Sequence, residues 1–345
     1  MTDMSFSPIL ARKIRAGDIW EYAIPTHQKL IEALKGSQTE EAISLANYSV
    51  ETFKIIYDLY DQWIAGLKDF FSEEGVSYEE IQTVTDNLLD LVKMPDGAPF
   101  IPDNEWKALL ALQNELTTHI ESSNVNLALA AAEMMRESWR RIHDRYVDWI
   151  YGYLDFASKR FGEGHVEKAF RFIIEPFFNK RYARFNLRTH PWNEMVEVVL
   201  YLAAEAMHSH LVGPKRDGEF ELTEEEDRWV FKFNPCGSGG RSLRGDVIEG
   251  TGPRMEPPYN YAVTKEEHPW SWGQQGVCYY CTQCCLLMEK MPIENWGYPV
   301  RVVEPPTYPE LVEAKCTWYV YKDLDQIPEK FYTRLGHQKP PATKR

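Results

Sequence analysis

Apolar residues recur at intervals of three and four along the first two hundred residues of the chain, and runs that alternate apolar with polar residues are rare there. This spacing places the apolar side chains on one face of an α-helix. The stretch ETFKIIYDLYDQWIAGLKDF is typical of it. We therefore expect a helical N-terminal part that ends with a strongly apolar helix over about 192–212.

The helical part repeats itself. Residues 51–70 align without gaps on ESWRRIHDRYVDWIYGYLDF at 137–156, at an offset of 86, and nine of the twenty positions are identical. The segment KMPDGAPFIPDN, rich in turn-forming residues, lies between the copies. We interpret this as an internal duplication of helical units at 16–75 and 102–162, which would bury their apolar faces against one another.

The pattern changes in the last third of the chain. Trp229, Phe231 and Phe233 stand at every second position, which is the rhythm of a half-buried β-strand. The stretches YPVRVVE at 298–304 and KCTWYVYKD at 315–323 have a similar pattern. A small antiparallel sheet is therefore expected to follow the helices.

These patterns predict an α+β protein. We expect a helical domain over 1–215 that contains the duplication, then a cysteine-rich α+β domain over 216–330, and a flexible tail over 331–345. At 345 residues, with 44% hydrophobic residues, the chain can fill cores of this size.

Charge and composition narrow the range of partners. The formal net charge of −14 argues against binding to a nucleic-acid backbone, which requires an excess of Lys and Arg. No apolar run approaches the eighteen or so residues of a membrane span, and the first residues lack the apolar stretch of a signal peptide. We expect a cytoplasmic protein that binds a small molecule rather than nucleic acid or membrane, and association into a homo-oligomer is left open.

Cysteines give the strongest chemical signal. Five of the six fall between residues 236 and 285, and the sixth is Cys316. In a reducing compartment, clustered cysteines are more often metal ligands than disulfides. Cys281 and Cys284 have the two-residue spacing that lets both thiolates bind one metal ion, and Cys236, at the end of a predicted strand, is the natural third ligand.

The fourth ligand is less well defined. We favour a zinc site of Cys236, His268, Cys281 and Cys284, with Cys278 as the alternative to His268. The series Cys278-x-x-Cys281-x-x-Cys284 is also similar to iron–sulfur spacing, which makes a cluster the alternative cofactor. We assign the remaining two cysteines to other surroundings: a helix face turned away from the metal for Cys285 and a strand core for Cys316.

A glycine loop follows the first cysteine. Its glycines permit backbone conformations that expose successive N–H groups, so the loop predicts an anion-binding nest, although a plain tight turn is the alternative. We expect two nearby arginines to hold the anionic group of a substrate. The predicted nest consists of Gly237, Ser238, Gly239 and Gly240, and the two arginines are Arg241 and Arg244.

Two further histidines are candidates in the helical part. His143 occurs in only one copy of the repeat, where the other has Tyr57, so it is either a proton carrier or a helix histidine bonded to a neighbour. Glu205 and His208 form a single Glu-x-x-His pair, whereas a di-iron bundle needs two such pairs.

The sequence therefore predicts a zinc-dependent enzyme that acts on a small anionic substrate by hydrolysis or a lyase step. The expected substrate is a carboxylate, with or without an aromatic group. An iron–sulfur redox protein is the first alternative. A non-enzymatic ligand sensor or scaffold with a structural zinc is the second.

Overall fold

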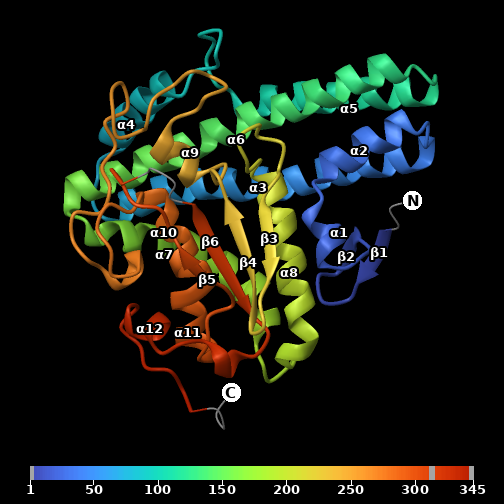
Figure 1. Cartoon of the computed structure of the whole chain (residues 1–345). Helices are drawn as coiled ribbons and strands as arrows, with labels where there is room; N and C mark the ends of the chain where they lie inside the picture. The colour runs from blue at the N-terminus through green and yellow to red at the C-terminus, as the bar shows by residue number, and fades with distance from the viewer. Residues whose placement is uncertain (1–3, 311–314, 342–345) are drawn as a thin grey trace.

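Two helical hairpins lie across the upper part of the molecule (Figure 1). The computed structural model describes residues 4–310 and 315–341. In the first hairpin α2 (Thr26–Lys35) turns into α3 (Thr39–Glu73), and in the second α5 (Pro102–Glu121) turns into α6 (Val125–Phe161). The end of α2 and the start of α3 lie 86 positions before the end of α5 and the start of α6. The hairpins thus match in layout, and their origin in one duplication stays a prediction.

The helices form because each carries an apolar stripe. In α3, Tyr60, Trp63, Ile64 and Leu67 are buried at the i, i+3, i+4, i+7 spacing of one helix face. The middle of α6 differs, since nearly every residue over 139–155 is buried, charged ones included. This part of α6 is enclosed because the second half of the chain packs over the side that a two-hairpin bundle would leave open.

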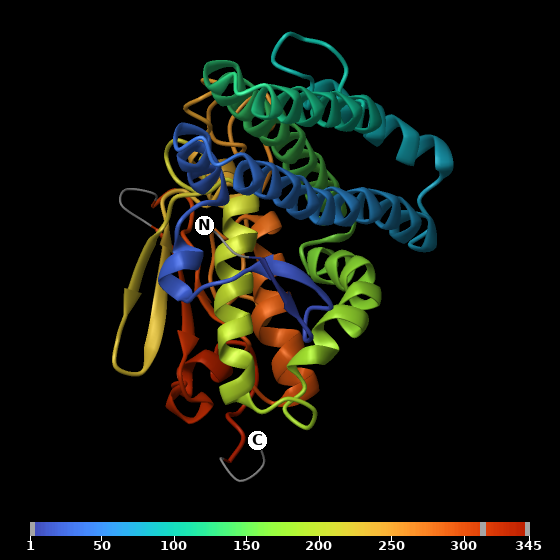
Figure 2. The same cartoon turned by 90° about the vertical axis from the view of Figure 1, so that its right-hand side faces the viewer.

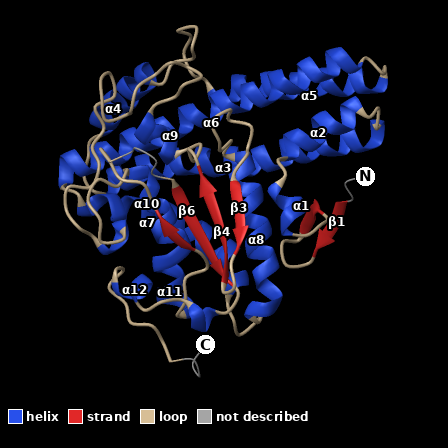
Figure 3. Ribbon diagram, viewed as in Figure 1, coloured by secondary structure: helices blue, strands red, loops and turns tan. Residues whose placement is uncertain are grey.

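A four-stranded antiparallel sheet lies below the hairpins, in the order β3-β4-β6-β5 (Figure 3). Its central pair joins β4 to β6, with Phe231 opposite Trp318. The predicted α+β class is confirmed, and three of the strands fall within the predicted stretches. The strands are β3 (Glu221–Glu224), β4 (Arg228–Phe233), β5 (Val302–Glu304) and β6 (Cys316–Tyr321).

Figure 2 shows α8 standing beside the segment of α10 and α11, with the sheet to one side and the long helices across the upper ends. A single set of contacting buried apolar side chains runs through the helical part and the sheet part. The remaining helices are α1 (Ile19–Ala23), α4 (Tyr78–Leu91), α7 (Gly164–Arg181), α8 (Trp192–Ser209), α9 (Gly239–Arg244), α10 (Thr282–Cys285), α11 (Met291–Trp296) and α12 (Lys330–Thr333); the short 3-10 and π turns are η1 (Tyr182–Phe185), η2 (Pro269–Ser271), η3 (Tyr279–Cys281), η4 (Leu286–Lys290) and η5 (Leu324–Gln326).

Both ends of the chain differ from the prediction. The first described residues form a hairpin of β1 (Met4–Ser7) and β2 (Arg12–Arg15) that the helical pattern did not predict. The flexible tail is wrong for its first part, because α12 and the turn after it bury Phe331, Tyr332 and Leu335 in the core. Residues 342–345 of that prediction lie outside the described residues. Among the described helices, none has the length and apolar character needed to span a bilayer.

Candidate functional site

A cavity of about 210 Å³ lies between the hairpins and the cysteine-bearing segments. α3 and α8 form one side of it, and the loop after β4, the η3–α10–η4 segment and the start of β6 form the other. Most of the lining is apolar, and two of the aromatic residues near the cysteines, Trp272 and Tyr280, belong to it. A concave, mostly apolar cavity with a few polar groups is the usual form of a small-molecule site.

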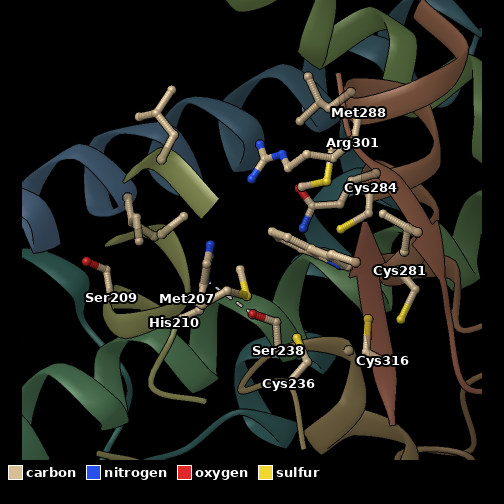
Figure 4. Close-up of a pocket in the computed structure, with 18 of the residues that line it drawn as sticks. Met207, Ser209, His210, Cys236, Ser238, Cys281, Cys284, Met288, Arg301 and Cys316 are labelled. Atoms are coloured by element: carbon tan, nitrogen blue, oxygen red, sulfur yellow. Dashed lines mark hydrogen bonds between the residues drawn. The ribbon is translucent and has the colours of Figure 1, made fainter. Parts of the chain in front are cut away.

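Four cysteines line this cavity from three separate segments (Figure 4). Cys236 comes from the loop after β4, Cys281 and Cys284 come from the η3–α10 turn, and Cys316 begins β6. We refer to these four side chains as the thiol cluster. All six cysteines of the chain are free thiols. The structure thus brings the three predicted cysteine ligands to one cavity.

Cys316 was assigned to a strand core, and the structure places it in the cavity wall instead. The side of the strand was predicted correctly, because Cys316 and Trp318 do share one side of β6. That side, however, borders the cavity, and Trp318 lines it as well. Position along a strand gives the face of a residue but not what the face meets, so sequence alone could not include Cys316.

The glycine loop is built to pack closely against its neighbours. A Cβ atom on Gly239 would lie 2.2 Å from the Sγ atom of Cys281, and one on Gly237 would lie 1.7 Å from the backbone oxygen of His210. Burial raises the pKa of Cys236, whereas hydrogen bonds from the backbone of Ser238, Gly240 and Gly239 act in the opposite direction. The predicted nest therefore faces the Cys236 sulfur within the protein, which leaves an external anion without these donors.

The thiols are not arranged around a single point. Within the described residues, no three His, Cys, Asp or Glu side chains converge closely enough to hold a metal ion as they stand. Burial raises the pKa of Cys284 and Cys316, and Cys236 contributes to the rise in both. Several buried thiols that oppose each other's ionisation would become thiolates when a cation enters among them.

His268 was predicted as the fourth ligand, and the structure gives it another partner. Its Nε2 lies 2.7 Å from a carboxylate oxygen of Glu163, and its ring stacks on Trp270. His268 is not among the residues that line the cavity. The same carboxylate also accepts hydrogen bonds from the backbone of Lys265 and Glu266. His268 thus fixes this loop to the turn between α6 and α7, a role that a spacing argument does not reveal.

The other two cysteines lie outside the cavity lining. Cys278 is fully buried and hydrogen-bonds to Cys281, and this interaction contributes most to the raised pKa of Cys281. Cys285 is also fully buried, with its Sγ directed to the backbone oxygen of Pro269. Cys278 therefore contacts the thiol cluster through Cys281 and lies outside the cavity.

The cavity also contains a cation that sequence reasoning missed. Arg301 precedes β5, is 5% exposed and reaches into the cavity (Figure 4). Neither its Nε nor its Nη1 has a hydrogen-bond partner among the described residues. Burial lowers its pKa, while Tyr182 and Cys284 act in the opposite direction. A buried guanidinium without a carboxylate partner is costly, and a bound anion would relieve that cost.

The two arginines predicted to hold an anion lie elsewhere. Arg241 is buried, donates to a carboxylate oxygen of Asp148 at 2.6 Å and lies 3.5 Å from Asp144. Arg244 hydrogen-bonds the side-chain oxygen of Asn234. Neither arginine lines the cavity. The prediction failed for Arg241 because the buried carboxylates that face it come from α6, about ninety positions away in sequence.

Asp144 is the centre of a buried ionic network. Its oxygens lie 3.0 Å from Arg140 and 2.7 Å from Arg216, in addition to the contact with Arg241. Burial alone would raise the pKa of Asp144, but Arg216 and Arg241 outweigh it and hold that pKa well below its usual range. The carboxylate is therefore ionised and can only accept hydrogen bonds.

His143 connects this network to the cavity. Its Nδ1 lies 2.9 Å from Asp144, and its Nε2 lies 2.9 Å from the Nδ1 of His210 and 3.2 Å from the hydroxyl of Ser238. His143 itself does not line the cavity, whereas His210 and Ser238 do. His143, which occurs in only one copy of the repeat, therefore contacts residues of the cavity wall but does not line the cavity itself.

The Glu-x-x-His pair of α8 has a structural role. Glu205 forms an ion pair with the buried Arg15 of β2 and accepts a hydrogen bond from Tyr48. The two ring nitrogens of His208 face the backbone oxygens of Gly218 and Tyr22. These contacts attach the N-terminal hairpin and α1 to α8, and they leave no iron-binding arrangement on that helix.

The chain matches no protein-family model, no curated protein and no solved structure. A functional assignment therefore has to come from the chemistry of the cavity itself.

Proposed function

We propose that the protein is a metal-dependent enzyme that acts on a small, mostly apolar anion bound in the cavity beside the thiol cluster. Arg301 carries this proposal. It is buried, two of its nitrogens have no hydrogen-bond partner in the described part of the chain, and it shares the cavity with four cysteines. The anionic group would bind Arg301, and the apolar lining would hold the rest of the molecule.

The metal in this proposal is zinc, with Cys236, Cys281 and Cys284 as ligands. Three thiolates leave one position of a tetrahedral ion open for water or substrate, whereas a fourth from Cys316 would close it and make the metal structural. An open zinc would activate water or polarise a carbonyl group, which fits hydrolysis or a lyase step. A reducing compartment such as the cytoplasm keeps the thiols available.

One observation favours a second candidate, an iron–sulfur redox protein. The four thiols surround the cavity but do not converge on the position of a single ion. A four-iron cluster is bound by four cysteine thiolates and is wider than one ion, so its ligands stand further apart. In this second candidate Cys316 becomes an essential ligand.

Metal and sulfide analysis of the purified protein separates the two candidates. Zinc without acid-labile sulfide and without visible absorbance supports the enzyme, while iron with sulfide and visible colour supports the cluster. Absence of both metals from protein purified anaerobically would contradict both proposals.

Anion binding is tested separately with benzoate and its uncharged analogue benzamide. Benzoate should raise the melting temperature, because a ligand that binds only the folded state stabilises it by about 2.7 kcal/mol at a hundred times its dissociation constant. Benzamide has nearly the same shape and should have little effect. An equal shift with both compounds would argue against recognition of the charge by Arg301.

A further inference from the structure

Hydrogen bonds at His210 determine which of its ring nitrogens carries a proton. His210 follows the last residue of α8 and lines the cavity, and its Nδ1 faces Nε2 of His143 at 2.9 Å. Figure 4 shows its ring directed into the open space, and the hydroxyl groups of Ser238 and Tyr60 each lie 3.3 Å from the same Nδ1 atom. Among the described residues, none forms a hydrogen bond with the Nε2 atom of His210.

The first step is the proton on His143. Asp144 is an ionised carboxylate held by Arg140, Arg216 and Arg241, so it cannot donate a hydrogen bond. The contact of 2.9 Å between Asp144 and His143 therefore needs a proton on Nδ1 of His143. A neutral imidazole has only one N–H group, which leaves the Nε2 atom of His143 as an acceptor.

The second step follows at His210. Two ring nitrogens 2.9 Å apart need one donor and one acceptor, and the acceptor is Nε2 of His143. Nδ1 of His210 must therefore carry the proton and donate. The remaining nitrogen, Nε2 of His210, then has a lone pair and faces the cavity.

Neutrality of the two imidazoles is supported by their surroundings. Burial lowers the pKa of His143, and Arg216 and Arg241 act in the same direction against Asp144. Burial also holds the pKa of His210 well below its ordinary value, with further contributions from His143 and Arg216. Both rings are thus uncharged near neutral pH, as the hydrogen-bond argument requires.

We propose that Asp144, His143 and His210 form a hydrogen-bonded relay that presents the unprotonated Nε2 of His210 to the cavity as a general base. His210 is the catalytic residue, and His143 and Asp144 are positioning residues. In the proton-transfer step an O–H or N–H bond of the ligand, or of water beside it, breaks and an N–H bond forms at Nε2. Nδ1–H of the resulting imidazolium still donates to His143, whose own Nδ1–H donates to the Asp144 carboxylate.

This inference deepens the proposed function, because it adds a proton acceptor to a cavity that already contains the anion-binding Arg301. Arg301 and His210 reach into the same space in Figure 4. The substrate class is therefore an anion that also carries a transferable proton, or one attacked by water. The relay rests on contacts independent of both metal and anion, so it can be tested without either.

The test is nitrogen NMR of the full-length protein labelled with 15N-histidine, which distinguishes the two neutral tautomers and the cation. His210→Gln identifies the resonances of residue 210. We expect His210 as the Nδ1–H tautomer with an unprotonated Nε2, and His143 as the Nδ1–H tautomer as well. A proton on Nε2 of His210, or an imidazolium at neutral pH, would overturn the relay whether or not benzoate binds.

A substitution at His143 tests the relay through the tautomer of His210, which would not change if His143 had a purely structural role. His143→Phe removes the acceptor, so His210 should lose its single tautomer and show exchange between both forms. His208 serves as the internal control, because its nitrogens face backbone oxygens of Tyr22 and Gly218, and its signals should not change. An unchanged His210 tautomer in a folded His143→Phe protein would also refute the relay.

Access to Nε2 is checked by diethyl pyrocarbonate, which acylates unprotonated imidazole nitrogens. Mass spectrometry should find His210 modified and His143 unmodified, since both nitrogens of His143 are engaged and buried. Modification of His143 in preference to His210 would contradict the assignment of roles.

Discussion

The Sγ atom of Cys281 occupies the space that a Cβ atom on Gly239 would need, at a distance of only 2.2 Å. The glycine loop therefore packs closely against the turn that contains Cys281. This contact, between residues 42 positions apart, packs the loop that carries Cys236 against the turn that carries Cys281.

Gly239→Ala tests that fit. The added methyl group must displace Cys281, and such overpacking typically costs about 1–3 kcal/mol. We expect a lower free energy of unfolding in urea together with a reduced metal content. Gly164→Ala is the matched control, because no atom from beyond its own stretch of backbone lies within 4 Å of the Cβ position there. If the two variants proved equally stable and equally metallated, the tight fit would have no energetic consequence.

Arg301 and Arg241 should respond in opposite ways to the same substitution. Arg301→Met removes a buried charge that lacks a carboxylate partner, so stability should stay unchanged or rise while the benzoate effect disappears. Arg241→Met leaves Asp148 and Asp144 short of a partner, and breaking a buried ion pair in this way costs about 3–5 kcal/mol. Calorimetry with and without benzoate measures both effects. A loss of stability in Arg301→Met as large as in Arg241→Met would identify Arg301 as a structural cation.

Single cysteine substitutions decide how many thiols hold the metal. Cys236→Ser, Cys281→Ser and Cys284→Ser should each lose zinc and unfold at lower temperature, since binding and folding are linked. Cys316→Ser should retain zinc if one coordination position is open.

The control for this series is Cys285→Ser, which changes a buried thiol outside the cavity. It is expected to alter stability without altering metal content. Zinc loss in Cys316→Ser would point to a closed four-thiolate site and therefore to a structural metal.

The buried ionic network should make stability depend on pH on the acid side. Burial alone would raise the pKa of Asp148, but Arg241 and Arg254 outweigh it, so this pKa is lowered in the folded protein. A carboxylate with a lowered folded pKa stabilises the protein above its unfolded pKa of about 3.9, and this contribution is lost as pH falls through the folded value.

Asp148→Asn should therefore destabilise the protein strongly at pH 7 and progressively less as the solution is acidified below the unfolded pKa. Urea unfolding of both proteins at several pH values measures the difference. A difference that stayed constant with pH would show that the Asp148 charge does not contribute to the network.

The sequence by itself determined the long helices, the central strands of the sheet and the set of cysteines. Spacings of three and four residues predicted the long helices, because one apolar face must be buried whatever its partner. Alternation predicted β4 and β6 for the same reason. Cys281 and Cys284 were selected by their two-residue spacing, and Cys236 was selected by its place at the end of a predicted strand.

The tertiary structure decided which charges are free and which are already paired. Arg241 looked available in sequence, yet Asp148 neutralises it. Arg301 attracted no notice, yet it is a buried cation in the cavity wall that has no carboxylate partner among the described residues. His268 is bonded to Glu163, and His210 gained its role from contacts with α6. The spacing of apolar residues along a helix or strand shows on which face a side chain lies. The pairing of buried charges depends instead on segments about a hundred residues apart, and only folding brings these together.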